Sequence, residues 1–232
     1  MLVPLIGKRW WSVCTLCTFT PTGPTSNPHH EYGPMPDTNH HKDVRLLRTH
    51  ILPLNTNFTG LTDIKICDWH DHPLLSPNIL PDSVLHLSLG YGFQQVLEEN
   101  QLPKNLLRLR FGDSFNRPLA ANVLPKTLIY LDLGQSFNMT MMPGVLPPSL
   151  AHLIFGNNFN QPLVVGVLPA SLSSLTFGDD FNQPLVENVL PTGLKSLSFG
   201  DHFNQPLLVL PDGLRVTLVK EFNKTFGQPR QE

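Results

Sequence analysis

The sequence predicts a helix-poor β-solenoid in which each coil contributes one short parallel strand. A motif of about 22 residues recurs at fixed spacing along most of the chain. Typical copies contain two prolines, which the interior of a helix does not accept. Apolar residues alternate over a short stretch of each copy, with the period of a strand. Repeats of this length indicate a stacked array, because a unit so small buries its apolar face only against its neighbours.

The repeat is marked most clearly by a phenylalanine that precedes an asparagine in most copies. Its template reads L-P-x-x-L-x-x-L-x-F-G-x-x-F-N-Q-P-L-x-x-x-V and covers residues 57–226, as six regular units between two degenerate ones. The marker phenylalanines are Phe93, Phe115, Phe137, Phe159, Phe181 and Phe203. We expect this column to lie in the core, since shared packing is what makes positions recur in a solenoid.

The strand is expected in the segment L-x-x-L-x-F. In one copy, Leu175 and Phe177 alternate with Ser174 and Thr176, which is the pattern of a half-buried strand. The connection between Q-P-L and the next L-P, as in residues 185–191, is too short for a stable helix. One strand per unit is therefore the only regular element that each copy can form.

Two further columns have a structural interpretation. An amide side chain can donate and accept hydrogen bonds, and buried loops need such partners. The asparagine column therefore predicts a structural ladder rather than an array of ligand sites, and its members are Asn116, Asn138, Asn160, Asn182 and Asn204. The glycine that ends each strand predicts either a positive φ or a close backbone approach.

Residues 1–56 differ in composition from the repeats. They are rich in proline, glycine and histidine without an apolar period, which predicts a disordered N-terminal arm, and residues 227–232 form a short tail. The first residues lack the charged-then-apolar order of a signal peptide. We therefore expect a cytoplasmic protein, with secretion as the alternative.

Composition excludes several classes of function. The chain has 232 residues, 41% of them hydrophobic and 15% charged, which is typical of a globular protein. A net charge of -2 gives no electrostatic basis for binding nucleic acid or an anionic membrane. No apolar run has the length of a membrane span, and three cysteines cannot build a disulfide framework.

The sequence offers no convincing catalytic, cofactor or metal site. Asp113, Asp179 and Asp201 follow strand-ending glycines, but other coils have Tyr, Gln or Asn there, so turn chemistry explains the column better than calcium. Cys14 and Cys17 form one C-x-x-C, which falls short of the ligand set that zinc requires. Nucleophile-elbow and phosphate-loop motifs are absent. We predict a protein that is not an enzyme and has no cofactor and no metal.

The motifs FNQPL and FGDDFNQPL, separated by LPxxLxxLxFG, resemble the FNIP repeat family. The resemblance covers about three-quarters of the chain and implies a leucine-rich-repeat-like fold. The repeated asparagine lies two residues beyond its place in ordinary leucine-rich repeats, so we expect the ladder to be built around a different turn. Some family members place an F-box before the repeats, but residues 1–56 contain no such motif.

Function is expected at the positions where the repeats differ, on the outward face of the strands. Extended solenoid faces bind partners, and arginine and tyrosine are favoured anchors of interfaces. The candidate residues are Lys65, His86, Arg108, Arg110, Tyr130, Asp132, His152, Ser174, Thr176 and Ser196. We predict a scaffold that binds a protein or peptide there. The alternatives are a merely solvated face, an adaptor of the ubiquitin-ligase type whose N-terminal arm recruits a partner, and an enzyme of unknown type.

Overall fold

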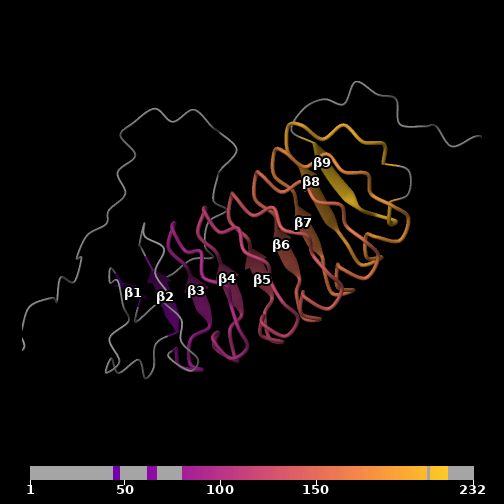
Figure 1. The fold of residues 1–232 in the computed structure, drawn as a ribbon. Helices are drawn as coiled ribbons and strands as arrows, with labels where there is room; N and C mark the ends of the chain where they lie inside the picture. The colour runs from indigo at the N-terminus through magenta and orange to yellow at the C-terminus, as the bar shows by residue number, and fades with distance from the viewer. Residues whose placement is uncertain (1–43, 48–61, 67–79, 208–209, 219–232) are drawn as a thin grey trace, which may run out of the picture.

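A computed structural model describes residues 44–47, 62–66, 80–207 and 210–218, and they form a nine-stranded parallel sheet whose strands follow one another in chain order (Figure 1). The strands are β1 (Val44–Leu47), β2 (Asp63–Ile66), β3 (His86–Ser88), β4 (Arg108–Arg110), β5 (Tyr130–Asp132), β6 (His152–Ile154), β7 (Ser174–Thr176), β8 (Ser196–Phe199) and β9 (Arg215–Leu218). None of the residues in these ranges is helical, so they include no helix able to cross a membrane.

The pairing register follows the sequence repeat. From β3 to β8, each residue pairs with the residue one repeat later, so that His86 pairs with Arg108, Arg108 with Tyr130, and Tyr130 with His152. Each coil therefore returns to the same height of the sheet before the next strand begins. The prediction of a helix-poor solenoid with one short parallel strand per repeat is confirmed.

The sheet begins earlier than the repeat template predicts. Strand β1 pairs with β2 along its whole length, although Val44–Leu47 lies in the segment that the sequence assigned to a disordered arm. Strand pairing uses backbone groups and needs neither the marker phenylalanine nor the asparagine. An alignment built on those markers therefore misses this strand. The rest of the predicted arm, and the tail at residues 227–232, lie outside the described residues.

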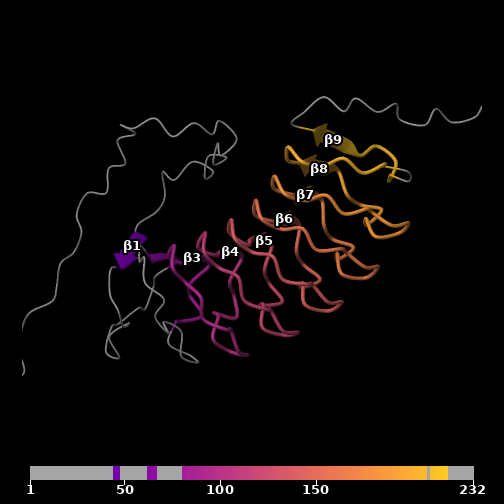
Figure 2. The same cartoon turned by 45° about the horizontal axis from the view of Figure 1, so that its top comes forward.

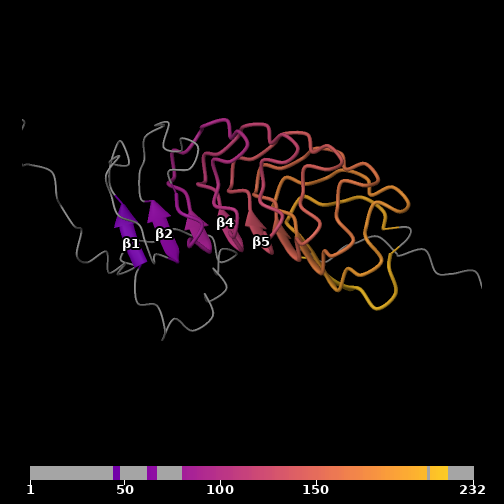
Figure 3. The ribbon, with the colours of Figure 1, turned by 90° about the horizontal axis from the view of Figure 1, so that it is seen from below.

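The stack of coils is curved, with the strands on the inner side of the bend and the loops on the outer side (Figures 2 and 3). Hydrogen bonding holds neighbouring strands about 4.8 Å apart. Ring centroids just after the strand are 5.4 Å apart, as for Phe155 and Phe177. Deeper in the loop layer, the centroids of Phe159 and Phe181 are 6.0 Å apart. Coil spacing thus grows with distance from the sheet, which bends the stack around its strand face.

The core between strands and loops contains two interlocking phenylalanine columns. The marker column runs from Phe93 to Phe203 with successive centroids 5.9–6.2 Å apart. The second column follows the strands and stacks on the first in four coils, at 3.9 Å for Phe155 on Phe159, whereas Leu89 and Leu133 take its place in the other two. All six marker phenylalanines are buried. Stacked rings of this size supply a large part of the buried apolar area of each coil.

Candidate partner-binding face

The inner side of the bend presents two rows of side chains, one from the first and one from the third residue of strands β2–β9. From β2 to β8 the residue between them is buried, as for Leu109 and Leu131, because successive side chains of a strand point to opposite faces. We call these two rows the strand face. The first row contains Asp63, His86, Arg108, Tyr130, His152, Ser174, Ser196 and Arg215. The second row contains Lys65, Ser88, Arg110, Asp132, Ile154, Thr176, Ser198 and Thr217. Every residue predicted for the partner surface lies in these rows.

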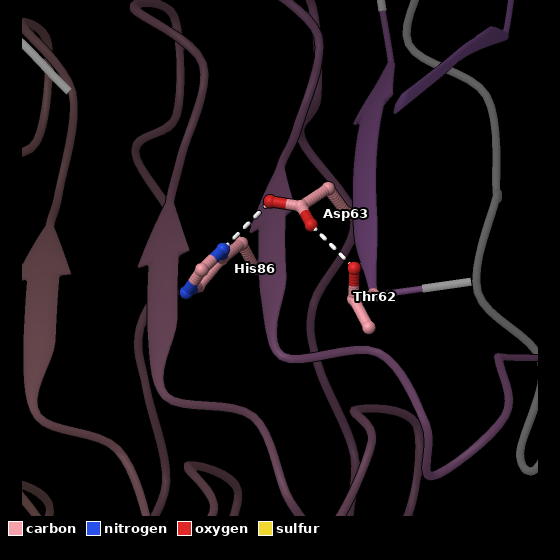
Figure 4. Close-up of polar contacts among 3 residues, drawn as sticks. All are labelled: Thr62, Asp63 and His86. Atoms are coloured by element: carbon pink, nitrogen blue, oxygen red, sulfur yellow. Dashed lines mark hydrogen bonds and ion pairs between the residues drawn. The ribbon is translucent and has the colours of Figure 1, made fainter. Parts of the chain in front are cut away.

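The N-terminal part of the strand face is fixed by a carboxylate between two coils. Asp63 Oδ1 lies 2.6 Å from Nδ1 of His86, and Thr62 Oγ1 donates to Asp63 Oδ2 at 2.6 Å (Figure 4). An ionised carboxylate only accepts hydrogen bonds, so Nδ1 carries the proton in this pair. The second ring nitrogen of His86 lies on the side away from Asp63 (Figure 4). The pair therefore orients the imidazole, whose side chain stays 32% exposed.

The centre of the strand face is a row of one guanidinium and two rings. The Cζ atom of Arg108 lies 5.6 Å from the centroid of the Tyr130 ring, and the His152 ring lies 6.4 Å from it on the other side. Burial, followed by the charge of Asp132, raises the pKa of Tyr130 above 10.0. Its phenol is therefore neutral at physiological pH and can donate a hydrogen bond.

The second arginine of strand β4 is in a different situation. Nε of Arg110 lies 3.3 Å from Oδ2 of Asp132, and Oδ1 of Asp132 accepts a hydrogen bond from the amide of Gly134 at 3.0 Å. The arginine side chain is 38% exposed, and the carboxylate is 16% exposed. The Arg110 charge is thus matched by a more buried partner on the next strand.

The C-terminal part of the strand face is small and uncharged between β7 and β8. Ser174, Thr176 and Ser196 are half-buried there and carry short hydroxyl side chains. Hydroxyl groups donate and accept hydrogen bonds, and short side chains let another main chain approach the sheet closely. The strand face therefore has charged and aromatic side chains at one end and short hydroxyl side chains at the other.

The predicted ladder asparagines lie away from this face, in the loop layer, and link one coil to the next. The side-chain oxygens of four of them accept hydrogen bonds from the main-chain amide one repeat later, at 2.9–3.0 Å. The donor–acceptor pairs are Asn138 to Asn116, Asn160 to Asn138, Asn182 to Asn160, and Asn204 to Asn182. Three glutamines donate to the same oxygens: Gln161, Gln183 and Gln205. These oxygens thus accept hydrogen bonds from the next coil, as a structural ladder requires.

Replacing Asn160 by leucine is expected to cost about 1–3 kcal/mol of the free energy of unfolding, because it removes the acceptor of two hydrogen bonds. The donors left behind are the Asn182 amide and Nε2 of Gln183, each 3.0 Å from Oδ1 of Asn160. Asn160→Asp keeps an oxygen in place and should lose less. Urea unfolding of the two variants measures the difference, and equal losses would mean that the ladder contributes no stability.

One repeated feature of the loops was not predicted. Asn100, Asn122 and Asn188 have φ between 62° and 64°, and Gly144 and Gly166 occupy the same turn with φ of 86° and 87°. Only glycine and, less readily, asparagine or aspartate adopt this conformation at low cost. The signal was readable, since an asparagine or glycine precedes V-L-P or Q-L-P in each of these coils.

Exposed apolar side chains lie beside these turns. Met142, Val164, Val165 and Val186 are 49–60% exposed and belong to three consecutive coils. We call them the turn ridge. They lie in the connecting segments rather than in the strands, so the ridge is separate from the strand face and offers control positions for mutagenesis.

The described residues support neither a metal site nor the recruitment of a partner by the N-terminal arm. Within residues 44–47, 62–66, 80–207 and 210–218, no group of three or more His, Cys, Asp or Glu side chains is placed to hold a metal ion. Cys14, Cys17 and the predicted N-terminal arm up to residue 43 lie outside the described residues. The adaptor hypothesis therefore stays a prediction.

The geometry defines a helix-poor, leucine-rich-repeat-like solenoid with a concave face lined by strands. Proteins of this class are generally non-enzymatic scaffolds. Residues 93–136, 137–180 and 181–216 match the FNIP Repeat family. The chain belongs to the FNIP repeat family, as its repeated motifs predicted.

A solved structure supports the leucine-rich-repeat-like architecture. The chain is similar to the protein of "The crystal structure of CroV588 a novel circular LRR protein structure", with 38% sequence identity and a TM-score of 0.60. The match covers 70% of this chain and 27% of that protein, so this chain spans only a part of its length. A comparison with the curated proteins finds no match.

Proposed function

We propose that the protein is a non-enzymatic scaffold that binds a protein or peptide partner on the strand face. The observation that carries this proposal is a contrast between repeated positions. The core and ladder columns keep nearly the same residue from coil to coil, whereas the strand-face rows change from charged to aromatic to hydroxyl residues. Stacking requires the uniform columns. Variation on a rigid, concave and accessible surface is what recognition of one particular partner needs.

The contacts within the strand face support a recognition role. Arginine and tyrosine dominate the binding energy of many interfaces. Here the Tyr130 ring is held between Arg108 and His152 before any partner arrives. Side chains that are already ordered lose less conformational entropy on binding, which strengthens the interaction.

The test is a variant that removes the central side chains together. A chain carrying Arg108→Ala, Arg110→Ala, Tyr130→Ala and His152→Ala is expected to lose its partner in affinity capture from host-cell lysate, followed by mass spectrometry. Each anchor residue of an interface contributes about tenfold or more in affinity. The substituted side chains are half-buried or exposed and lie outside the core, so the variant should still fold, which cooperative thermal unfolding followed by far-UV circular dichroism checks.

The matched control changes the turn ridge instead, with Met142→Ser, Val164→Ser and Val165→Ser. This control should capture the partner as the wild type does. Capture that survives the strand-face variant, or disappears in the turn-ridge variant, would contradict the proposed site. A partner lost only on deletion of residues 1–43 would place recognition in the N-terminal arm.

A further inference from the structure

We infer that the partner presents an extended segment whose Asp or Glu side chain binds the Arg108 guanidinium, beside His86 and Tyr130. This inference rests on the proposed function and gives it a ligand chemistry. It concerns one subsite of the strand face, on strands β3–β5, together with the direction in which the segment leaves that subsite.

The first argument is the unmatched charge of Arg108. Its guanidinium offers five N–H donors. Among the described residues, its side chain contacts the Tyr130 ring and has no carboxylate or hydrogen-bond acceptor. Two other arginines, Arg110 and Arg117, do have acceptors: Nε of Arg110 lies 3.3 Å from Oδ2 of Asp132, and Nε of Arg117 donates to the Gln94 carbonyl at 2.9 Å. Arg108 therefore has donors available to an incoming acceptor.

The second argument is the arrangement of its neighbours. In the parallel register, His86 and Tyr130 lie directly beside Arg108 on the adjacent strands, which are about 4.8 Å away. Asp63 fixes the imidazole of His86 through Nδ1, and the ring of Tyr130 supports the guanidinium. The subsite is thus preorganised on three strands. A planar guanidinium binds a carboxylate with two parallel hydrogen bonds, so its orientation matters as much as its charge.

The third argument selects a carboxylate over a phosphate. Asp63 and Asp132 both lie within two strands of Arg108 on the same face. A phosphate dianion in this subsite would be repelled by both carboxylates, and Arg110 is already paired with Asp132. A negative ligand next to carboxylates on the neighbouring strands is repelled, and the repulsion grows with the charge of the ligand. A single negative charge therefore fits the subsite better than a double one.

The fourth argument gives the direction of the segment. Beyond His152, the strand face carries the short hydroxyl side chains of Ser174, Thr176 and Ser196. These groups can bond to peptide N–H and C=O groups of a chain that crosses the strands. From β4 to β8 the distance is about 19 Å, which an extended chain covers in about six residues. The acidic residue should therefore lie toward one end of a segment of about six residues.

The experiment uses a phage-displayed library of random twelve-residue peptides, selected on the full-length protein. We expect the enriched peptides to share an Asp or Glu near one end. Binding of the best peptide should fall about 10- to 100-fold in Arg108→Gln, since it loses a charge-assisted hydrogen bond. Arg110→Gln is the matched control on the same strand and should change affinity less than about threefold. Replacing the peptide's acidic residue by phosphoserine should weaken binding.

The outcomes separate this inference from the proposed function. A variant with Ser174→Arg and Ser196→Arg blocks the other end of the strand face, so it identifies peptides that bind there. Enriched peptides that need this face but show no acidic preference, or that bind Arg108→Gln unchanged, would overturn the inference and leave the proposed function intact. An unsuccessful selection would also overturn the inference. Peptides that bind every strand-face variant as tightly as the wild type would contradict both the inference and the proposed function.

Discussion

Phe159→Ala is expected to remove about 3–5 kcal/mol of the free energy of unfolding. Phe159 has an exposed fraction of 0% and lies at the centre of the interlocking columns. Its centroid is 3.9 Å from that of Phe155, 6.0 Å from that of Phe181 and 6.2 Å from that of Phe137. Truncation leaves a cavity bordered by three coils, and neighbouring rings cannot fill it without separating from their own partners.

A loss of this size is a large share of the total stability of a domain, which is about 5–15 kcal/mol. Urea unfolding followed by far-UV circular dichroism measures it. The control is Val164→Ala on the turn ridge, where the side chain is 49% exposed and the expected change lies within about 0.5 kcal/mol. A cost below about 1 kcal/mol for Phe159→Ala would mean that the phenylalanine columns do not hold the coils together.

The sequence predicted the solenoid because its repeat length determines the register as well as the fold. Once each coil contains 22 residues, Leu109, Leu131 and Leu153 must lie beside one another. Their buried position then follows from the alternation of the strand. The location of the candidate residues on one sheet face was predictable for the same reason.

The different states of the two arginines on β4 could not be predicted in this way. Arg108 and Arg110 occupy equivalent outward positions in the short motif RLR. One lies against the Tyr130 ring, and the other forms an ion pair with Asp132. Such pairings depend on side-chain rotamers across neighbouring coils, which no local pattern encodes. The curvature was also beyond the sequence, since it arises from coil spacings that increase from the strands to the loops.

The sequence predicted two alternative reasons for the glycine that ends a strand: a positive φ or a close approach of another backbone. Gly134 has a φ of 76°, but Gly112, Gly156, Gly178 and Gly200 do not have a positive φ. All five lack space for a side chain. A Cβ at Gly156 would lie 1.7 Å from the carbonyl oxygen of Gly134 in the preceding coil. Close packing of backbone on backbone is therefore the shared requirement.

Gly156→Ala is accordingly expected to cost at least the upper end of the about 1–3 kcal/mol that is typical of overpacking. The added methyl group would meet main-chain atoms of Gly134 and Gln135 at 1.7–2.6 Å, and backbone cannot turn aside as a flexible side chain can. Relief requires the two coils to move apart. Such a movement would strain the adjacent pairing of β5 with β6 and weaken the stacking of the phenylalanine rings between the same coils.

Gly193→Ala is the matched control, because the same methyl group enters ordinary contact there. Gly193 has no positive φ, and its nearest non-neighbouring atom would be the Ala170 carbonyl oxygen at 3.4 Å. This variant should be neutral or more stable by up to about 1 kcal/mol, since alanine restricts the unfolded chain. Both variants add the same methyl group at a glycine without a positive φ. The difference between their free energies of unfolding in urea therefore measures the cost of the close backbone contact alone. Equal stabilities would show that the coils tolerate a wider spacing at the strand ends, and the tight curvature around the strand face would then need another cause.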